Sequence, residues 1–515
     1  MIPRHRFCLE GSAARPRRSA PPAAAALAAL AFAAFAAAAA PVYAGVLVPD
    51  RTNDPILPDY CIGGCSLRGA VLAANLAPGA DVVLLGPGIY RLAVPGRGET
   101  LGAGGDLDVH GELAVIGAGA DRTVIDAAGL DRAFEVHGGA RLTLYGVTVR
   151  GGDAGAGDGG VIAAAPASEL TLDRVTVEGG HAGGSGGGVW AAGALAVRSS
   201  TFAGNHAALR GGAIAAYEQA EIVGSTLSDN HAHGTDGGGI WLARGAALEL
   251  RSSTLCENTA MSRGGGVAVD SGAAARVSGS ILAGNVTWAG GPDCVGPVTS
   301  GGYNLIAAGH LCGALADGVD GDQVGAIEAP LDALLGPLAM NGGPTPTHAP
   351  LAGSPAIDRG DPAGSCAGAD QRGEPRPAAP GFITAGPALC DVGAVEAGAR
   401  CVVGPGALCM GGGRFRVTAS WEVEPGAVPE PAQAVQLTPD TGYFWFFRDS
   451  NVEVVAKVLD ACAGFDRWWV FASGLTNVGV SLTVEDLAGE RSTTYRRDRG
   501  PAFAPLQDTD AFRCP

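Results

Sequence analysis

The sequence predicts an all-β chain, in which a parallel β-helix (a solenoid of stacked coils) is followed by a β-sandwich-like domain. Three observations support this prediction. An eleven-residue block recurs six times, successive copies start 25 to 28 residues apart, and a glycine run follows most of the later copies. The copies occupy 142–152, 170–180, 195–205, 220–230, 248–258 and 275–285. A period of this length, with short alternating strands and no helical stripe, is typical of coils that stack and share one core.

The alternation inside each block predicts which side chains face that core. Positions 1, 3 and 8 are apolar in nearly every copy, as in Leu248, Leu250 and Leu255. Because side chains alternate along a strand, positions 2 and 4 are expected to face outward. The last position is asparagine in four consecutive copies, namely Asn205, Asn230, Asn258 and Asn285. We predict that these amides bond from coil to coil as a structural ladder, with ligand binding as the alternative.

The chain before the repeats predicts an export signal and a cap. Residues 1–44 combine an arginine-rich start, an alanine-rich run and a small-residue cleavage site that ends at Ala44. A membrane anchor is the alternative. No later segment is long and apolar enough to span a membrane, so we expect a secreted or cell-surface protein without membrane insertion after cleavage. Residues 45–100, with a short helix at 67–75, are expected to close the first coil.

The rest of the chain divides by composition. Regular coils are expected over 101–290, and terminal coils with Pro/Gly-rich loops over 291–400. About seven alternating apolar segments follow, which is typical of a β-sandwich at 401–515. This domain contains two aromatic runs, 443–447 and 468–469. Neighbouring residues of a strand face opposite sides of the sheet, so these rings cannot all lie in the core. We expect them to pack in the core or to dock onto the solenoid, with carbohydrate contact as the alternative.

Charge and lysine content exclude two classes of function. The formal net charge of −17 argues against nucleic acid as a partner, because phosphate binding needs clustered cations. Lys457 is the only lysine, so the glycine-rich stretches are not phosphate-binding P-loops, which require a lysine. Glycine is expected there because coil corners need positive φ and close backbone approach. We expect a monomer without a cofactor.

The cysteines of an exported chain predict disulfides. No pair of CxxC motifs is present, so zinc ligation is not expected. The expected local pairs are Cys61–Cys65, Cys294–Cys312 and Cys366–Cys390, with Cys401, Cys409, Cys462 and Cys514 paired among themselves. Cys256 is left over after signal cleavage, and no other copy of the repeat has a cysteine at its position. We therefore expect Cys256 to be a thiol.

Several segments resemble a family of exported bacterial proteins. The sequence CSLRGA (65–70) resembles the CSLREA domain, with Gly69 where that domain usually has glutamate. Three further motifs, in this order, resemble the choice-of-anchor Q domain: LLGPLAMNGGPTPTHAPLAGSPAIDRGDP (334–362), ADQRGEPRP (369–377) and CDVGAVE (390–396). The resemblance covers about 45–400 and implies a right-handed parallel β-helix on an exported or surface protein. It implies no catalytic residues.

One column of histidines is a candidate metal site. His181, His206 and His231 recur 25 residues apart, so their rings could stand in register and bind a transition metal. No acidic column accompanies them, and the next two copies lack the histidine. We therefore expect partly exposed turn histidines and no bound metal. Asp153 and Asp158 are a calcium alternative that lacks the full nonapeptide pattern.

A pair of glutamates is the candidate catalytic group. Glu221 and Glu249 share one outward slot on adjacent coils, so their carboxyls could lie about 5 Å apart, the separation found in retaining glycosidases. With Arg251 they would form the site of a polysaccharide lyase or glycoside hydrolase. The other interpretation is a solvated charge ladder with the neighbouring arginines. We favour the ladder, and with it a structural, adhesive or glycan-binding role without catalysis, with a glycan or another cell-surface component as partner.

Overall fold

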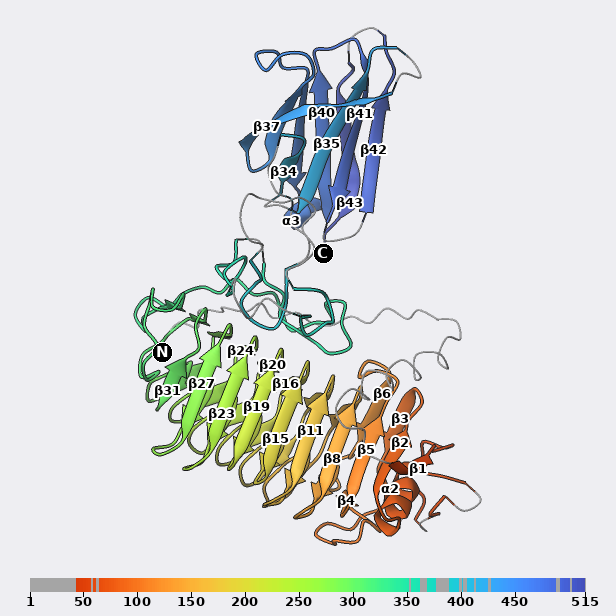
Figure 1. Cartoon of the computed structure of the whole chain (residues 1–515), viewed down its shortest axis with the longest axis vertical. Helices are drawn as coiled ribbons and strands as arrows, with labels where there is room; N and C mark the ends of the chain where they lie inside the picture. The colour runs from red at the N-terminus through yellow and green to blue at the C-terminus, as the bar shows by residue number, and fades with distance from the viewer. Residues whose placement is uncertain are drawn as a thin grey trace. The chain divides into compact units, whose positions relative to one another are not determined.

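The computed structural model has two compact units (Figure 1). It describes residues 43–515 except 57–58, 62–63, 352, 362–367, 377–388, 398–400, 402–404, 412–413, 425–427, 488–490, 501–502 and 515. The first unit holds the chain up to Pro350 together with Ser354–Arg376 and Cys390–Glu396, and the second includes Ala397–Pro515. The predicted export signal lies outside the described residues, apart from its last two residues. None of the helices in the described ranges is long and apolar enough to cross a membrane.

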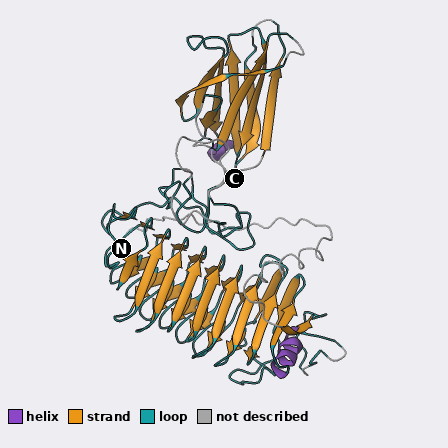
Figure 2. Ribbon diagram, in the orientation of Figure 1, coloured by secondary structure: helices purple, strands orange, loops and turns teal. Residues whose placement is uncertain are grey.

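Four parallel sheets run along the first unit, so it is the predicted β-helix (Figure 2). Sheet 1 contains β1 (Tyr43–Leu47), β2 (Ala80–Leu84), β5 (Glu112–Ile116), β8 (Arg141–Tyr145), β11 (Glu169–Asp173), β15 (Ala194–Arg198), β19 (Gln219–Val223), β23 (Ala247–Arg251), β27 (Ala274–Ser278) and β31 (Val298–Ser300). Sheet 2 contains β3 (Gly88–Arg91), β6 (Thr123–Asp126), β9 (Thr148–Arg150), β12 (Thr176–Glu178), β16 (Thr201–Ala203), β20 (Thr226–Ser228), β24 (Thr254–Cys256), β28 (Ile281–Ala283), β32 (Leu305–Ile306) and β33 (Gln323–Val324).

Two narrower sheets complete each coil. Sheet 3 contains β13 (His181–Ala182), β17 (His206–Ala207), β21 (His231–Ala232), β25 (Thr259–Ala260) and β29 (Val286–Thr287). Sheet 4 contains β4 (Leu107–Val109), β7 (Phe134–Val136), β10 (Ile162–Ala164), β14 (Val189–Ala191), β18 (Ile214–Ala216), β22 (Ile240–Leu242), β26 (Val267–Val269) and β30 (Cys294–Val295). A regular coil visits the four sheets in this order, and a glycine-rich loop joins sheet 3 to sheet 4.

The core consists of in-register apolar columns. Leu172, Val197, Ile222, Leu250 and Val277 pair in succession across five strands of sheet 1, and each is fully buried. Burying a side chain of this size contributes about 1.5–3 kcal/mol. The inward assignment of the apolar block positions is therefore confirmed.

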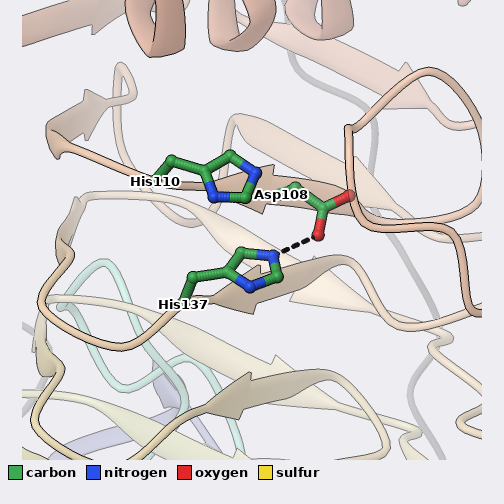
Figure 3. A group of neighbouring side chains, drawn as sticks. All are labelled: Asp108, His110 and His137. Atoms are coloured by element: carbon green, nitrogen blue, oxygen red, sulfur yellow. Dashed lines mark hydrogen bonds and ion pairs between the residues drawn. The ribbon is translucent and has the colours of Figure 1, made fainter.

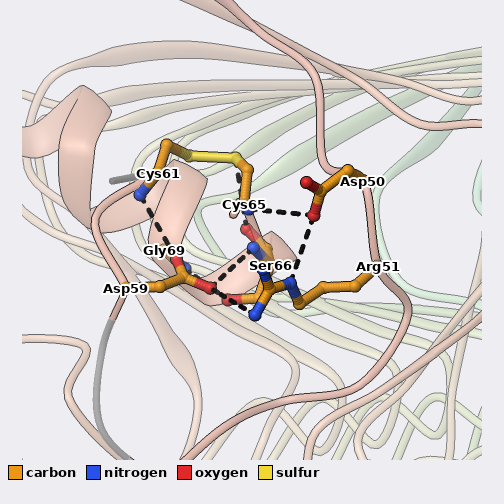
Figure 4. Close-up of a disulfide and its surroundings, with 7 residues drawn as sticks. All are labelled: Asp50, Arg51, Asp59, Cys61, Cys65, Ser66 and Gly69. Carbon is orange, nitrogen blue, oxygen red and sulfur yellow. Dashed lines mark hydrogen bonds and ion pairs between the residues drawn. A yellow bond between two sulfur atoms is a disulfide. The ribbon is translucent and has the colours of Figure 1, made fainter. Parts of the chain in front are cut away.

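A short helix and a disulfide close the first coil (Figure 4). Helix α2 (Leu67–Leu76) starts after Ser66, whose hydroxyl accepts a hydrogen bond from the Gly69 amide at 3.0 Å. The Asp59 carboxylate accepts from the Ser66 amide at 2.9 Å, beside the Cys61–Cys65 disulfide. A β-carbon on Gly69 would lie 1.6 Å from Asp59 Oδ1, so a larger residue here would displace that carboxylate from the Ser66 amide.

The predicted asparagine ladder is present. The Asn205 amide group donates to Asn230 Oδ1 at 2.9 Å, Asn230 donates to Asn258 at 2.8 Å, and Asn258 donates to Asn285 at 2.9 Å. The last amide, that of Asn285, donates to Asp293 Oδ1 at 2.9 Å. Burial raises the pKa of Asp293 to about 7. In each of these turns, the residue before the asparagine has the positive φ. The asparagines are therefore needed for their hydrogen bonds and not for the turn conformation.

A second polar ladder was not predicted. Four consecutive copies have serine at block position 6, and each serine hydroxyl accepts from the backbone amide one coil earlier at 3.0–3.1 Å. The serines are Ser200, Ser225, Ser253 and Ser280. Asn304 continues the column and donates to buried Asp322 at 3.0 Å. Both ladders satisfy backbone groups inside the solenoid and end on a carboxylate.

The segment after the coils folds back over sheet 2. Gln371 donates to Thr201 Oγ1 at 2.8 Å and accepts from Thr226 Oγ1 at 2.7 Å, so its amide bridges two adjacent coils. His348 bonds Ser228 Oγ at 2.9 Å. All of these side chains are buried. The described parts of 334–396 thus cover a polar outer face, which explains the threonine column of sheet 2.

Four disulfides join described residues, and all agree with the predicted pairing. They are Cys61–Cys65, Cys294–Cys312, Cys401–Cys409 and Cys462–Cys514. Cys366 lies outside the described residues, so its pairing with Cys390 stays a prediction. The prediction of a thiol at Cys256 is wrong, because Cys256 is disulfide-bonded. The sequence argument compared Cys256 only with the residues at the same block position in the other copies. That comparison does not consider segments from outside the repeat.

The second unit is the predicted sandwich, with two antiparallel sheets around an apolar core. One sheet contains β34 (Leu408–Met410), β35 (Phe415–Glu422), β36 (Glu430–Pro431), β41 (Gly479–Asp486) and β42 (Arg491–Arg497), and the other contains β37 (Gln433–Thr438), β38 (Thr441–Trp445), β39 (Val454–Asp460), β40 (Arg467–Gly474) and β43 (Leu506–Arg513). A short helix, α3 (Cys462–Phe465), precedes β40. In the aromatic run Phe444 is fully buried and Phe447 is 54% exposed, so the run is divided between core and surface as expected.

Candidate functional site

The predicted glutamate pair lies on the outer face of sheet 1. Glu221 and Glu249 face each other in the register of β19 and β23. Glu221 forms ion pairs with Arg198, at 3.0 Å, and with Arg251, and the Glu249 carboxylate lies 3.9 Å from Arg276. About a third of each glutamate side chain is exposed. This geometry is a solvated charge ladder, the second of the two interpretations.

Sheet 4 presents a different outer face. Its central outward column runs in strict register through eight strands. The column reads Asp108, Glu135, Ala163, Trp190, Ala215, Trp241, Ala268 and Val295. The flanking residues of each three-residue strand point into the core, so the middle residue faces out. Acidic residues thus occupy one end of the column, and large aromatic residues alternate with alanine along its middle.

The aromatic part forms a continuous ladder. The Tyr217 ring lies edge-on to Trp190 at 5.7 Å and to Trp241 at 5.3 Å, measured between ring centroids. The Arg210 guanidinium lies 4.8 Å above the Trp241 ring and helps to cover it. Tyr217 is 37% exposed and Trp190 is half-buried, whereas Trp241 is only 3% exposed. Trp190 and Tyr217 are therefore the rings that a ligand can reach, and Trp241 supports them.

The acidic end is a dense cluster of charge. Asp106 lies 3.4 Å and Glu135 lies 3.2 Å from the Arg132 guanidinium. Burial and the nearby Asp131 carboxylate raise the pKa of Asp106 to about 8. Asp108 is fully buried, and this burial also raises its pKa. Acidic groups outnumber the single arginine here, so this end of the face is electronegative.

Histidines accompany this cluster. Asp108 Oδ1 lies 2.6 Å from His137 Nε2, and the rings of His110 and His137 stack at 4.1 Å (Figure 3). Two groups of described residues bring three metal-ligating atoms within 4.8 Å of one another: Asp108 with His110 and His137, and Asp106 with Asp108 and Glu135. Neither group includes the calcium candidates Asp153 and Asp158, whose carboxylates cap the Gly155 and Ser185 amides instead.

The predicted histidine column is stacked on sheet 3. The His206 ring lies 5.0 Å from His181 and 4.8 Å from His231, and His233 joins the stack with its Nε2 3.2 Å from His206 Nδ1. Burial, together with the neighbouring rings, lowers the pKa of His206 to about 4. These side chains are exposed or half-buried as expected, but they occupy short strands rather than turns.

A hollow of about 310 Å³ lies beside the last coils of the first unit. Its lining includes Trp288, which is 79% exposed, together with Val286 and Pro292. The Asp293 carboxylate, which also lines the hollow, already accepts hydrogen bonds from Asn285 and from the Ala308 amide at 2.6 Å. The hollow therefore offers an apolar wall, but its carboxylate is already engaged in hydrogen bonds and has little left to offer a ligand. A second, shallower hollow of about 210 Å³ lies in the second unit and contains Lys457.

Sequence reasoning missed the sheet 4 face. The signal was present: each glycine run is followed by a three-residue strand, and its middle residue is tryptophan in alternate coils, at Trp190 and Trp241. These short strands lie outside the eleven-residue block, so the comparison of blocks did not align them. Asp108 and His137 lie in the less regular coils before the first block, where the repeat gives no register.

Comparisons with known proteins give a distant structural match and no sequence match. Neither protein-family comparisons nor a search of curated proteins finds a match. Among solved structures, a mutant of AlyGC, a PL6 family alginate lyase, aligns with 14% sequence identity and a TM-score of 0.28. The alignment covers 50% of this chain and 40% of the lyase chain, so the chain spans less than half the length of that protein.

Proposed function

We propose that this protein is an exported, non-catalytic β-helix that binds an extended neutral polysaccharide along the outer face of sheet 4. The observation that carries the proposal is the aromatic ladder of Trp190, Tyr217 and Trp241. Sugar rings stack on exposed aromatic faces, and for each such contact we assume the value for a pair of aromatic rings, about 0.5–1.5 kcal/mol. Trp190 and Tyr217 belong to adjacent coils, about 4.8 Å apart along the solenoid, so one extended chain can cross both rings.

The other faces of the first unit offer less to a glycan. The described parts of 334–396 cover the sheet 2 threonines, and the sheet 1 glutamates are engaged by arginines. On sheet 4, the alanines between the aromatic residues (Ala163, Ala215 and Ala268) are buried, so the surface that this face offers to a flat ligand is that of the Trp190 and Tyr217 rings. Arg210 and Asp270 flank the ladder and supply a donor and an acceptor for sugar hydroxyls.

Charge favours a neutral glycan over an acidic one. The chain has a formal net charge of −17, and the acidic end of the sheet 4 column includes Asp108 and Glu135. A polyuronate would be repelled by this field, whereas a neutral polysaccharide is not. Export rests on the arginine-rich and alanine-rich leader at 1–44, on the disulfides, and on the resemblance to CSLREA and choice-of-anchor Q proteins.

Binding to an array of neutral and uronate polysaccharides tests this proposal, followed by titration calorimetry with the best neutral glycan. Tyr217→Ala and Trp190→Ala should each weaken binding about tenfold, since one stacking contact of ~1.4 kcal/mol corresponds to that factor. Trp288→Ala is the matched control, because Trp288 is a more exposed tryptophan in the same unit and lies away from the ladder.

The proposal fails if both ladder variants bind as tightly as the parent, or if only Trp288→Ala loses binding. Preference for a uronate polymer would overturn the charge argument. Circular dichroism of each variant distinguishes loss of the ligand contact from loss of the fold.

A further inference from the structure

The register of sheet 4 brings two histidines and a carboxylate to one point. Asp108 is the central residue of β4, and Val109 pairs with Val136 of β7. His110 and His137 follow these paired residues, so they occupy equivalent positions on adjacent coils. Their rings stack at 4.1 Å with 16° between planes, and Asp108 lies beside their edges (Figure 3).

The carboxylate is held in place from its other side. Asp108 Oδ2 accepts a hydrogen bond from the Gly102 amide at 2.7 Å, while Oδ1 faces His137 Nε2 at 2.6 Å. His110 Nε2 lies 3.0 Å from the Thr100 carbonyl oxygen. The loop that contains Thr100 and Gly102 therefore orients two of the three side chains, as outer-shell groups do around metal ligands.

We propose that Asp108, His110 and His137 bind a divalent transition-metal ion, with Zn²⁺ as the best fit. Two imidazole nitrogens and one carboxylate oxygen are preferred zinc ligands, and a three-residue site leaves a fourth position for water or a glycan hydroxyl. The three ligating atoms already lie within 4.8 Å of one another. Zinc ligands lie about 2.0–2.2 Å from the ion, and imidazole lone pairs lie in the ring plane, so the exposed His110 ring must turn out of its stack with His137 to reach the ion.

The neighbouring carboxylates fit calcium poorly. Asp106 and Glu135 share a group with Asp108, but the Arg132 guanidinium already lies 3.4 Å and 3.2 Å from their oxygens. The single arginine balances at most one of the two acids, but its guanidinium occupies the oxygens that a second cation would need and would repel that cation. Calcium also requires six or more oxygen ligands, whereas the histidine side of Asp108 supplies nitrogen.

The stacked histidines of sheet 3 are a second set of side chains in this protein that could compete for the same ion. His206 and His233 place two ring nitrogens 3.2 Å apart, and His231 bonds Asp229 at 3.0 Å. These residues do not bring three ligating atoms together in the described structure. A chelate with three ligands should bind far more tightly than a pair, so His110 and His137 are expected to take the first equivalent.

The test is Zn²⁺ binding by the full exported chain, measured by competition with a chromophoric chelator. The parent should bind one equivalent tightly, and Co²⁺ in its place should give the visible absorption of a four-coordinate site. His110→Ala is the principal variant, because His110 is exposed and its loss leaves the fold intact. It should lower affinity by at least about 100-fold, as should His137→Ala, because loss of an outer-shell partner alone costs about 10–100-fold.

His206→Ala is the matched control, and it should retain the parent affinity. The proposal is overturned if the parent binds no Zn²⁺, if Ca²⁺ displaces Zn²⁺ at equal concentration, or if His206→Ala loses the ion while His110→Ala keeps it. None of these outcomes depends on polysaccharide binding, so this experiment tests the metal site independently of the proposed glycan-binding face.

Discussion

Arg68 and Asp54 form a buried, two-pronged ion pair at the cap of the solenoid. Arg68 Nε and Nη2 donate to the two Asp54 oxygens at 2.8 Å and 3.0 Å, and both side chains are less than 5% exposed. The same guanidinium donates to the carbonyl oxygens of Gly102, Gly105 and Asp106 at 2.8–2.9 Å. The arginine of the CSLR segment thus fastens the loop that orients Asp108 and His110.

Arg68→Ala should lower the free energy of unfolding by about 3–5 kcal/mol, because it leaves the Asp54 carboxylate buried without its partner. Arg122→Ala is the control: Arg122 is half exposed beside Asp121, and its loss should change stability by less than ~1 kcal/mol. Urea denaturation of both variants checks this. Equal stabilities would show that the ion pair does not hold the cap.

Leu250→Asp should cost about 3–5 kcal/mol, because the new carboxylate would be buried between coils without a partner. Leu250 is fully buried between Ile222 and Val277. Glu249→Gln changes the adjacent outward residue and should be nearly neutral. Thermal unfolding of the two variants is the measurement, and a Leu250→Asp melting point within a degree or two of the parent would contradict the inward assignment.

Asn258→Ala should destabilise the first unit by at least about 2 kcal/mol, since several buried groups lose their partners. The Asn258 side chain accepts from Asn230 and donates to Asn285 and to the Leu227 carbonyl oxygen at 2.9 Å. Thr259→Ala, at the next residue, keeps the ladder intact and should have little effect. Urea unfolding compares them, and identical midpoints would mean that the ladder adds no stability.

The periodic part of the fold follows from the sequence, and the site does not. Strands, inward positions and the asparagine ladder repeat with the block, so one coil predicts the next. The Asp108–His137 contact joins two irregular coils, and its register depends on where β4 pairs with β7. Cys256 lies in one buried cluster with Val392, and Thr226 donates to Gln371. Both partners are more than a hundred residues away, which no local pattern reveals.

Stability should fall as the pH is lowered from about 6.5 to about 4, in part through His206. Its pKa in the folded protein is about 4 against an ordinary 6.5, so the unfolded chain takes up a proton in this range while the folded chain does not. This contribution is fully present above pH 6.5 and is lost toward pH 4. His206 faces His181, His231, His233 and Asp229.

His206→Gln should flatten this part of the stability profile, measured by urea unfolding at half-unit steps of pH. The buried His348 also has a lowered pKa and remains in both proteins, so the difference between parent and variant isolates His206. Parallel profiles would show that His206 does not titrate differently on unfolding.

The mature protein should not cleave glycans through the Glu221 and Glu249 pair. A glycosidase needs its acid and nucleophile in a cleft that excludes water, but both glutamates lie on an outer face with about a third of each side chain exposed. Glu221 also forms ion pairs with Arg198 and Arg251, and these pairs would keep its carboxylate from attacking a sugar.

Incubation with neutral and uronate polysaccharides, with and without Ca²⁺ or Zn²⁺, should release no reducing ends and no unsaturated products. Glu221→Gln and Glu249→Gln serve as controls. Cleavage that disappears in these variants with the fold intact would replace the binding role by an enzymatic one.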